Sequence, residues 1–327
     1  MFHHNPGLVR QLGWLVAAGA ALALLPLVLD PYWTRLAVFV FINIGLASAW
    51  NVIGGMAGYP SFGHSVFFGL GAYTGAILTV RYGFPFWATL PLAGLAAGLF
   101  SLLFMPLFKQ RGFYFALSTL AAALAVEAIV RTWTWVRGYK TSDHGWNLPN
   151  EMSVVFFYYL GLALLLLCLA SILVLIASRV GMALRAIHRD ETVAASVGVD
   201  CTRYKAIAFA FSAVWPGIFG AMYGPFLVYI SAETVFDLKI TLNMIVYSVF
   251  GGVGTFLGPI LGGVALSAID QLAWAHFLDY HSMIYGVVIV LIITFSPGGV
   301  MSWIKRPGRA AAPATPKPAK VAARSAA

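Results

Sequence analysis

Long apolar segments follow one another through most of the chain, with short polar connections between them. A helix needs about 20 mostly apolar residues to cross a bilayer. Ten segments approach or reach that length, so the pattern predicts an all-α polytopic membrane protein with its transmembrane domain over residues 1–306. The predicted spans are Leu12–Leu29, Leu36–Gly55, Phe62–Val80, Phe86–Phe108, Gly112–Val130, Val154–Ala177, Ala206–Tyr223, Ile240–Gly252, Phe256–Trp274 and Tyr280–Phe295.

Two glycine-rich stretches interrupt this pattern, at Gly54–Gly63 and Gly251–Gly263. Irregular backbone at membrane depth is stable only where protein or a water-filled cavity satisfies its polar groups. The stretches resemble each other, GGMAG beginning the first and GGVG the second, and paired broken helices mark substrate paths in transporters. Close helix packing by small residues explains the glycines equally well. Some helices are therefore predicted to be broken, with both explanations open.

One polar segment, residues 178–204, separates the sixth predicted span from the seventh. Between Gly181 and Gly198 its apolar residues recur at roughly helical spacing, and Gly198 suits a helix end because glycine readily adopts positive φ. The apolar face is small and mostly alanine, which favours insertion into the groove of another protein. A helix lying on lipid would carry Trp, Phe and Leu instead. The segment is predicted to be a cytoplasmic coupling helix that docks a soluble partner, with binding to the lipid surface as the alternative.

Composition and charge fix the class and the orientation. The chain is 61% hydrophobic and 9% charged, against about 25% charged residues in soluble domains. Its net charge is +9, and a cytoplasmic N-terminus followed by ten spans places 14 of the 20 Lys and Arg residues on the cytoplasmic side. Positive charge concentrates on that side in membrane proteins. Both termini are therefore predicted to be cytoplasmic.

Two connecting regions have a distinct composition. Residues 307–327 form an Ala/Pro/Lys-rich tail, predicted to be disordered and to bind lipid rather than nucleic acid. Residues 132–153 form an external loop rich in tryptophan. Its aromatic residues fit an interfacial belt, and a docking surface for a soluble binding protein is the alternative.

The predicted membrane domain has few residues that could support catalysis or bind a metal. No group combines a nucleophile, a base and an orienting residue, and Cys168 and Cys201 lie in different environments. The sequence therefore predicts no enzyme, no cofactor and no metal. It also lacks the Gly-x-x-x-x-Gly-Lys-Ser/Thr loop of nucleotide-binding proteins.

Polar residues inside the membrane are costly and often functional. Asn51, His64, Glu127 and Asn243 are the candidates for a translocation path. Glu127 precedes Arg131 by four residues, so a helical ion pair is a sufficient structural explanation for it. Asn51 and His64 flank the first glycine break and either brace its backbone or face the path.

Five segments carry a distinctive combination of motifs: 49–64 (AWNVIGGMAGYPSFGH), 67–73 (FFGLGAY), 181–187 (GMALRAI), 191–198 (ETVAASVG) and 251–259 (GGVGTFLGP). Together they resemble the branched-chain amino acid permeases of ABC importers. They are similar to the loop by which such permeases engage their ATPases, the approach to that loop, and the family's early and late glycine signatures. The resemblance covers roughly Ala37 to Gly298, and the layout resembles the LivM type of subunit.

The resemblance implies a set of partners: a LivH-like second permease subunit, two cytoplasmic ATPase subunits, and a periplasmic substrate-binding protein. Three positions depart from the family pattern. Ser196 and Asn243 stand where acidic residues are expected, and His144 interrupts an Asp-Gly pair. These departures bear on the substrate rather than on the fold. The implied ATPase-docking residues are Arg185, Arg189, Glu191, Ala194, Ala195 and Gly198.

The expected function is that of a multi-pass permease subunit in a bacterial inner membrane, translocating branched-chain or related neutral amino acids. Separate ATPases would supply the energy. One alternative keeps this architecture but carries urea, short amides or small organic acids. The other is an ion-coupled secondary transporter that acts alone.

Overall fold

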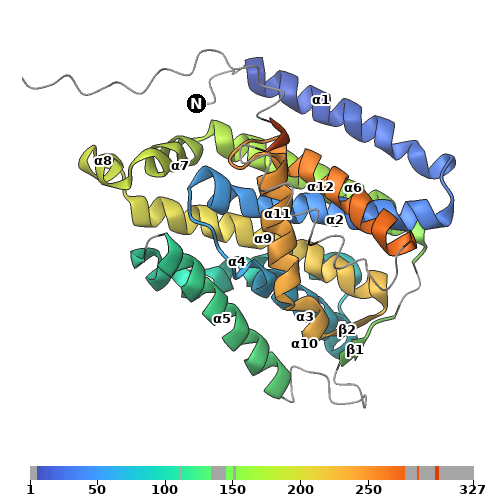
Figure 1. The fold of residues 1–327 in the computed structure, drawn as a ribbon. Coiled ribbons are helices and arrows are strands. Elements are labelled where there is room, and N and C mark those ends of the chain that lie inside the picture. Colours follow the sequence, from blue (N-terminus) through green and yellow to red (C-terminus); the bar gives the residue numbers. More distant parts are fainter. Residues whose placement is uncertain are drawn as a thin grey trace, which may run out of the picture.

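The computed structural model describes residues 6–110, 112–133, 145–149, 152–276, 286 and 299–301. Regular structure within them is almost entirely helical (Figure 1). The helices are α1 (Pro6–Ala23), α2 (Pro31–Asn51), α3 (His64–Tyr82), α4 (Phe86–Ser101), α5 (Phe113–Thr132), α6 (Val154–Ala177), α7 (Arg179–Arg189), α8 (Glu191–Ser196), α9 (Cys201–Leu227), α10 (Ala232–Val235), α11 (Leu238–Gly251) and α12 (Gly258–His276). Short η1 (Leu25–Leu27), η2 (Val52–Met56) and η3 (Leu102–Lys109) extend or join them, and two strands are β1 (Gly145–Asn147) and β2 (Tyr229–Ser231).

Seven helical stretches among the described residues are long and apolar enough to cross a membrane, so the polytopic class is confirmed and the predicted number of ten is not. The span predicted at Phe62–Val80 corresponds to α3, which is less apolar than the other long helices because glycine, serine and threonine interrupt it. The helix over Gly258–Asp270 is apolar but short. The span predicted at Tyr280–Phe295 lies outside the described residues, apart from Gly286. The seven stretches are Val9–Leu27, Pro31–Met56, Phe86–Lys109, Phe113–Thr132, Val154–Ala177, Cys201–Leu227 and Ala232–Gly251.

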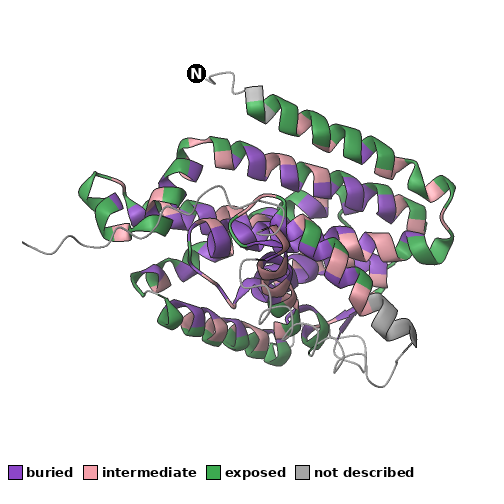
Figure 2. Ribbon diagram, turned by 45° about the horizontal axis from the view of Figure 1, so that its top comes forward, coloured by how far each residue is buried: buried purple, intermediate pink, exposed green. Residues whose placement is uncertain are grey.

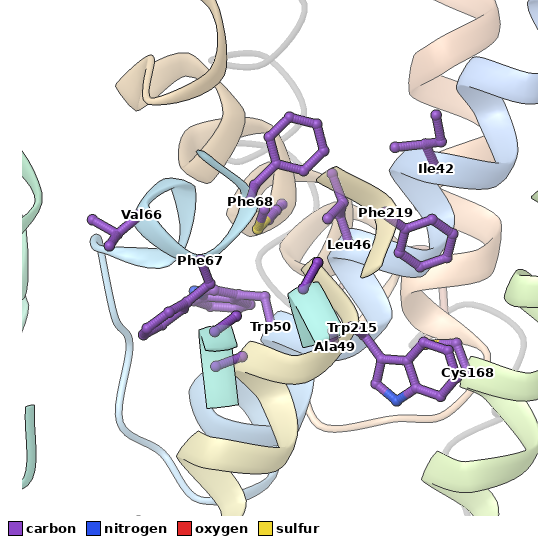
Figure 3. Packing of buried hydrophobic residues seen from close by; sticks show 14 of the residues in the cluster. Ile42, Leu46, Ala49, Trp50, Val66, Phe67, Phe68, Cys168, Trp215 and Phe219 are labelled. Atoms are coloured by element: carbon purple, nitrogen blue, oxygen red, sulfur yellow. The ribbon is translucent and has the colours of Figure 1, made fainter. Parts of the chain in front are cut away.

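The core forms where α2, α3, α4, α6 and α9 pack together (Figure 2). Figure 3 shows part of it, with Trp50 from α2, Phe67 from α3, and Trp215 and Phe219 from α9. Glycines bring α3 and α9 close: a Cβ at Gly71 would run into the backbone of α9. α3 is therefore surrounded by protein, which explains why a moderately apolar sequence suffices there.

Two helices lie at the edges of the bundle. α1 is mostly exposed and runs along α6 (Figures 1 and 2). The Tyr158 hydroxyl of α6 donates to the carbonyl oxygen of Leu22 in α1 at 2.6 Å. α5 carries a long exposed face that includes Phe113 and Tyr114. Exposed apolar faces of this kind suit contact with lipid or with another membrane helix.

The expectation of a purely helical chain needs one correction. β1 and β2 form a short antiparallel ribbon in which Trp146 lies opposite Ile230. Trp146 was predicted to belong to an aromatic belt, but its side chain is buried and lies under the Arg81 guanidinium. Trp133 is exposed. Residues 134–144 of the external loop, and the tail at 307–327, lie outside the described residues.

Candidate docking segment and its links to the glycine breaks

The polar segment between α6 and α9 forms two helices, α7 and α8, where the sequence predicted one. The break lies at Asp190, whose backbone is extended with φ −162° and ψ 112°. Its carboxylate accepts hydrogen bonds from the backbone N–H groups of Thr192 (2.8 Å) and Val193 (3.1 Å). Aspartate stabilises a helix start in this way, so Asp190 ends α7 and caps α8. Gly198, with φ +87°, follows the end of α8 as predicted.

The two helices present one face to the bundle and one to the outside. Leu184, Ile187 and Ala194 are buried. The outer face carries Ala195 and Gly198 together with the basic residues Arg185 and Arg189. Its exposed large apolar residues are Met182, Val193 and Val197, at 56%, 57% and 74% exposed. Of the residues predicted to dock an ATPase, Ala194 thus faces inward.

Glu191 also faces inward, and it meets the most deeply buried cation among the described residues. Its Oε1 atom lies 2.7 Å from Nζ of Lys205, whose side chain is only 1% exposed. The same ammonium donates to the Tyr59 hydroxyl at 3.0 Å and to the carbonyl oxygen of Phe108 at 3.4 Å. Tyr59 in turn donates to the second carboxylate oxygen of Glu191. We call Tyr59, Glu191 and Lys205 the ion-pair cluster.

The ion-pair cluster compensates the cost of a buried charge. A lysine ammonium has three donors, and here each has an acceptor. The rings of Tyr59 and Phe108 add their negative faces, with centroids 4.4 and 6.0 Å from Nζ of Lys205. A buried ion pair is stable only when its remaining hydrogen-bonding groups are satisfied in this way.

Tyr59 lies in the first glycine break, so the ion-pair cluster joins that break to α8 and α9. At the break α2 continues into η2, a single π-helical turn, and π-helical turns are frequent at functional sites. A second contact lies next to the cluster. Gly58 has φ +76°, and a Cβ there would lie 2.7 Å from Nδ1 of His188 on α7. The docking segment therefore touches the break at two points.

The first glycine break also contacts the second. The Asn51 side chain donates to the carbonyl oxygen of Thr255 at 2.8 Å and accepts from the backbone N–H of Gly254 at 2.9 Å. A Cβ at Gly55 would lie 2.5 Å from the backbone nitrogen of Gly254. The Asn51 amide thus satisfies irregular backbone that water would otherwise have to reach, and the two breaks meet as one unit.

The other polar residues predicted for a translocation path have separate surroundings. His64 is buried and its Nε2 lies 3.1 Å from the Ser212 hydroxyl. Glu127 lies 3.6 Å from Arg131, as the helical spacing predicted, but Arg131 is closer to Glu233, at 2.7 Å. A pair linking α5 to α10 could not be read from the sequence. The path itself stays a prediction.

Asn243 lines a small cavity in the first half of α11. Asn51, His64 and Glu127, the other residues predicted for the translocation path, do not line this cavity. Asn51 is instead engaged with the second glycine break, at Thr255 and Gly254.

Comparison with known protein families shows to which family the chain belongs. The family described as "Branched-chain amino acid transport system / permease component" matches residues 32–293. The chain belongs to this family. The match takes in α2 to α12, and with them the docking segment, the ion-pair cluster and both glycine breaks.

Individual permeases of this family are similar over most of the chain. The LivM permease of Salmonella typhimurium is 29% identical over 300 residues, 82% of this chain and 68% of the relative. The LivM permease of Escherichia coli is 28% identical over 323 residues, 90% and 75%. The LivH permease of Salmonella typhimurium is 26% identical over 125 residues, 38% and 40%. Each carries the description of a high-affinity branched-chain amino acid transport system. No solved structure matches the chain.

Proposed function

We propose that this permease is one of two membrane-spanning subunits of an ABC importer for branched-chain or related neutral amino acids. Separate cytoplasmic ATPases dock on α7 and α8, and a periplasmic protein delivers the substrate. The chain contributes no nucleotide site and performs no chemistry. The bacterial inner membrane is its location, with both termini in the cytoplasm, as the distribution of positive charge supports.

One observation carries the proposal: the docking segment is bonded to the glycine breaks. Glu191 opens α8 and pairs with Lys205 and Tyr59, and Tyr59 belongs to the first break. Asn51 holds that break to the second. A displacement of α8 by a partner is therefore transmitted through hydrogen bonds to the irregular backbone of both breaks. An energy-coupled permease needs such a route from its docking surface to the membrane interior.

The partners follow from the surfaces and the relatives. The outer face of α7 and α8 combines arginines with Val193, Ala195 and Val197, small side chains over which a partner's groove can close. Similarity to both LivM and LivH supports a pair of related permeases. The exposed apolar side of α1 offers the second permease a surface at the edge of the bundle.

The first test is isolation of the tagged chain from its native membrane in mild detergent, followed by mass spectrometry. We expect a second permease and two ATPases with phosphate-binding loops. Recovery of the chain alone across several mild detergents, with uptake driven by an ion gradient in liposomes, would refute the proposal and favour a secondary transporter. Uptake assays with the assembled complex then compare leucine with urea, short amides and organic acids.

The second test disturbs the docking face. Ala195→Trp adds bulk to an exposed position, and Gly198→Pro imposes φ near −65° where the chain has +87°. Each is expected to abolish ATP-driven leucine uptake while the chain still inserts. Gly83→Asn is the matched control, because Gly83 is a positive-φ helix end far along the sequence from the docking segment, and asparagine tolerates that conformation. Normal uptake by both docking variants would disprove the proposed docking face.

A further inference from the structure

A groove of 710 Å³ lies between η3 and the first half of α9. No residue of α7, α8 or the ion-pair cluster lines it. η3 ends the apolar stretch Phe86–Lys109, and α9 begins the stretch Cys201–Leu227. The groove therefore lies where two membrane-spanning stretches reach the same edge of the bilayer. In the predicted orientation this is the cytoplasmic edge.

Charged and polar side chains from the start of α9 form the mouth of the groove. Asp200, Thr202 and Arg203 line it, and all three are exposed. The Asp200 carboxylate accepts from the backbone N–H of Arg203 at 3.0 Å and so caps α9. The Arg203 guanidinium has no hydrogen bond or ion pair with the residues that the structure describes. A cation and an anion thus stand within one helical turn at the mouth.

The rest of the lining is apolar and continues the groove along α9. Ala206, Ile207 and Ala210 follow Arg203 by three, four and seven residues, so they share one face of the helix. At 1.5 Å per residue, this face runs about 10 Å from Arg203 into the membrane. A fitting ligand therefore has a charged head and an apolar tail. The opposite wall consists of exposed side chains of η3, Leu102 and Met105.

We propose that the groove binds one phospholipid of the surrounding bilayer whose headgroup joins a phosphate to a primary ammonium, as in phosphatidylethanolamine. The phosphate bonds to the Arg203 guanidinium and the ammonium to Asp200, while an acyl chain lies along Ile207 and Ala210. The planar guanidinium suits phosphate because it donates two parallel hydrogen bonds. Basic pockets between transmembrane helices at the cytoplasmic side are typical sites for lipid headgroups.

The two parts of the lining distinguish this lipid from other ligands. Free phosphate would leave the apolar walls in contact with water. Phosphatidylglycerol would bring its phosphate beside Asp200 with no ammonium to offset that carboxylate. Phosphatidylcholine keeps the positive charge, but methyl groups replace the N–H donors that a carboxylate accepts.

The position of the groove connects the lipid with the ion-pair cluster. η3 and α9 also hold the Lys205 ammonium, which donates to the carbonyl oxygen of Phe108 at 3.4 Å. Lys205 follows Arg203 by two residues, and Phe108 follows Met105 by three. A lipid bound to both walls keeps η3 and α9 together at this contact. It should therefore stabilise the folded chain, as any ligand of the native state does.

The test measures lipid binding to the purified full chain by native mass spectrometry. The chain is extracted in mild detergent, stripped of its own lipid, and titrated with phosphatidylethanolamine, phosphatidylcholine or phosphatidylglycerol of identical acyl chains. We expect phosphatidylethanolamine to reach half-saturation at a concentration about fivefold lower than the other two, the factor that one charged contact at the membrane surface contributes. Equal binding by the three lipids overturns the proposal.

Two charge variants test the contacts of the headgroup. Asparagine caps a helix as well as aspartate, so Asp200→Asn removes the charge and keeps the start of α9. It should weaken phosphatidylethanolamine to the level of phosphatidylcholine and leave phosphatidylglycerol no weaker. Arg203→Gln should weaken all three lipids about fivefold, because each has a phosphate. Arg179→Gln is the matched control, since Arg179 is exposed at the start of α7 and does not line the groove. Unchanged binding in both variants, or an equal loss in the control, overturns the proposal.

A third variant tests the apolar wall. Ala210→Phe fills the groove and should abolish the preference for phosphatidylethanolamine, whereas Ala121→Phe, on the exposed side of α5, should preserve it. Phosphatidylethanolamine should also raise the thermal unfolding temperature of the parent chain but not that of Ala210→Phe. The same response in both chains overturns the proposal.

Two results would assign the groove to another occupant. Displacement of the lipid by inorganic phosphate would show that a free anion suffices. Unchanged lipid binding by Arg203→Gln, together with lower recovery of the ATPases from the native membrane, would show that the groove is a protein contact. Either result overturns the proposal. The lipid titrations require neither ATPase nor transported substrate, so their failure leaves the proposed function unaffected.

Discussion

The ion-pair cluster allows an asymmetric prediction about stability. Glu191→Gln keeps the shape of the side chain but removes the negative charge, leaving the ammonium of Lys205 with only 1% exposure. Lys205→Met keeps most of the length but removes the positive charge, leaving a carboxylate that is 19% exposed and still accepts from Tyr59. Each variant therefore leaves one charge without its partner. The more deeply buried charge, that of Lys205, should cost more stability.

The expected losses of stability follow from how deeply each remaining charge is buried. Removing one partner of a buried ion pair costs about 3–5 kcal/mol, since the remaining charge is uncompensated. Glu191→Gln should reach that range. Water and Tyr59 offset part of the cost for Lys205→Met, for which we expect about 1–3 kcal/mol. The double variant strands no charge, so its cost should fall below the sum of the single costs by about 2 kcal/mol.

Thermal unfolding of the purified chain in mild detergent measures these differences. A thiol-reactive dye reports unfolding, because Cys168 and Cys201 are both buried and free and become accessible when the chain unfolds. We expect the lowest transition temperature for Glu191→Gln, and a partial recovery when Lys205→Met is added to it. A Glu191→Gln chain as stable as the parent, or strictly additive effects in the double variant, would refute the ion-pair reasoning.

Three further predictions concern the breaks and the periphery, each measured by the same unfolding assay. Asn51→Leu removes both bonds between the glycine breaks and should cost about 2–5 kcal/mol, since it leaves polar backbone groups unpaired; a stable variant would show that water replaces the amide. Gly55→Ala forces the break away from Gly254 and should destabilise strongly, whereas the control Gly13→Ala, with no neighbour within 4 Å, should not; equal effects would argue against the close approach. Glu127→Gln should cost about 1 kcal/mol or less, because its partner is half exposed, and a larger loss would point to a role beyond the ion pair.

The apolar pattern was sufficient for the long helices, because crossing a bilayer sets a length that the sequence displays. α6 begins and ends at the predicted residues, Val154 and Ala177. The apolar pattern also located α3, predicted at Phe62–Val80 and observed at His64–Tyr82. It was insufficient for β1 and β2, which are three residues each and pair across a long separation. Local polar pattern also missed the break at Asp190, where one side chain caps a new helix.

The candidate site was only partly accessible to sequence reasoning. Gly198 and the docking segment were found, because positive φ and polarity are local signals. Lys205 was not singled out from the sequence, because its partners Tyr59 and Phe108 are remote in the chain. Asn51 was expected either to brace the first break or to face the path, and its side chain bonds to the second break instead. Long-range pairing of this kind leaves no trace in a single chain.

The order of residues in the ion-pair cluster bears on how the protein is made. Tyr59, Phe108 and Glu191 all precede Lys205 along the chain, so every acceptor of its ammonium leaves the ribosome before the charge that needs it. A buried ammonium without acceptors is costly. The contacts of Lys205 with the bundle therefore form only after the first 191 residues are in place. In a nascent chain whose early helices insert wrongly, Lys205 would therefore lack its acceptors when α9 is made.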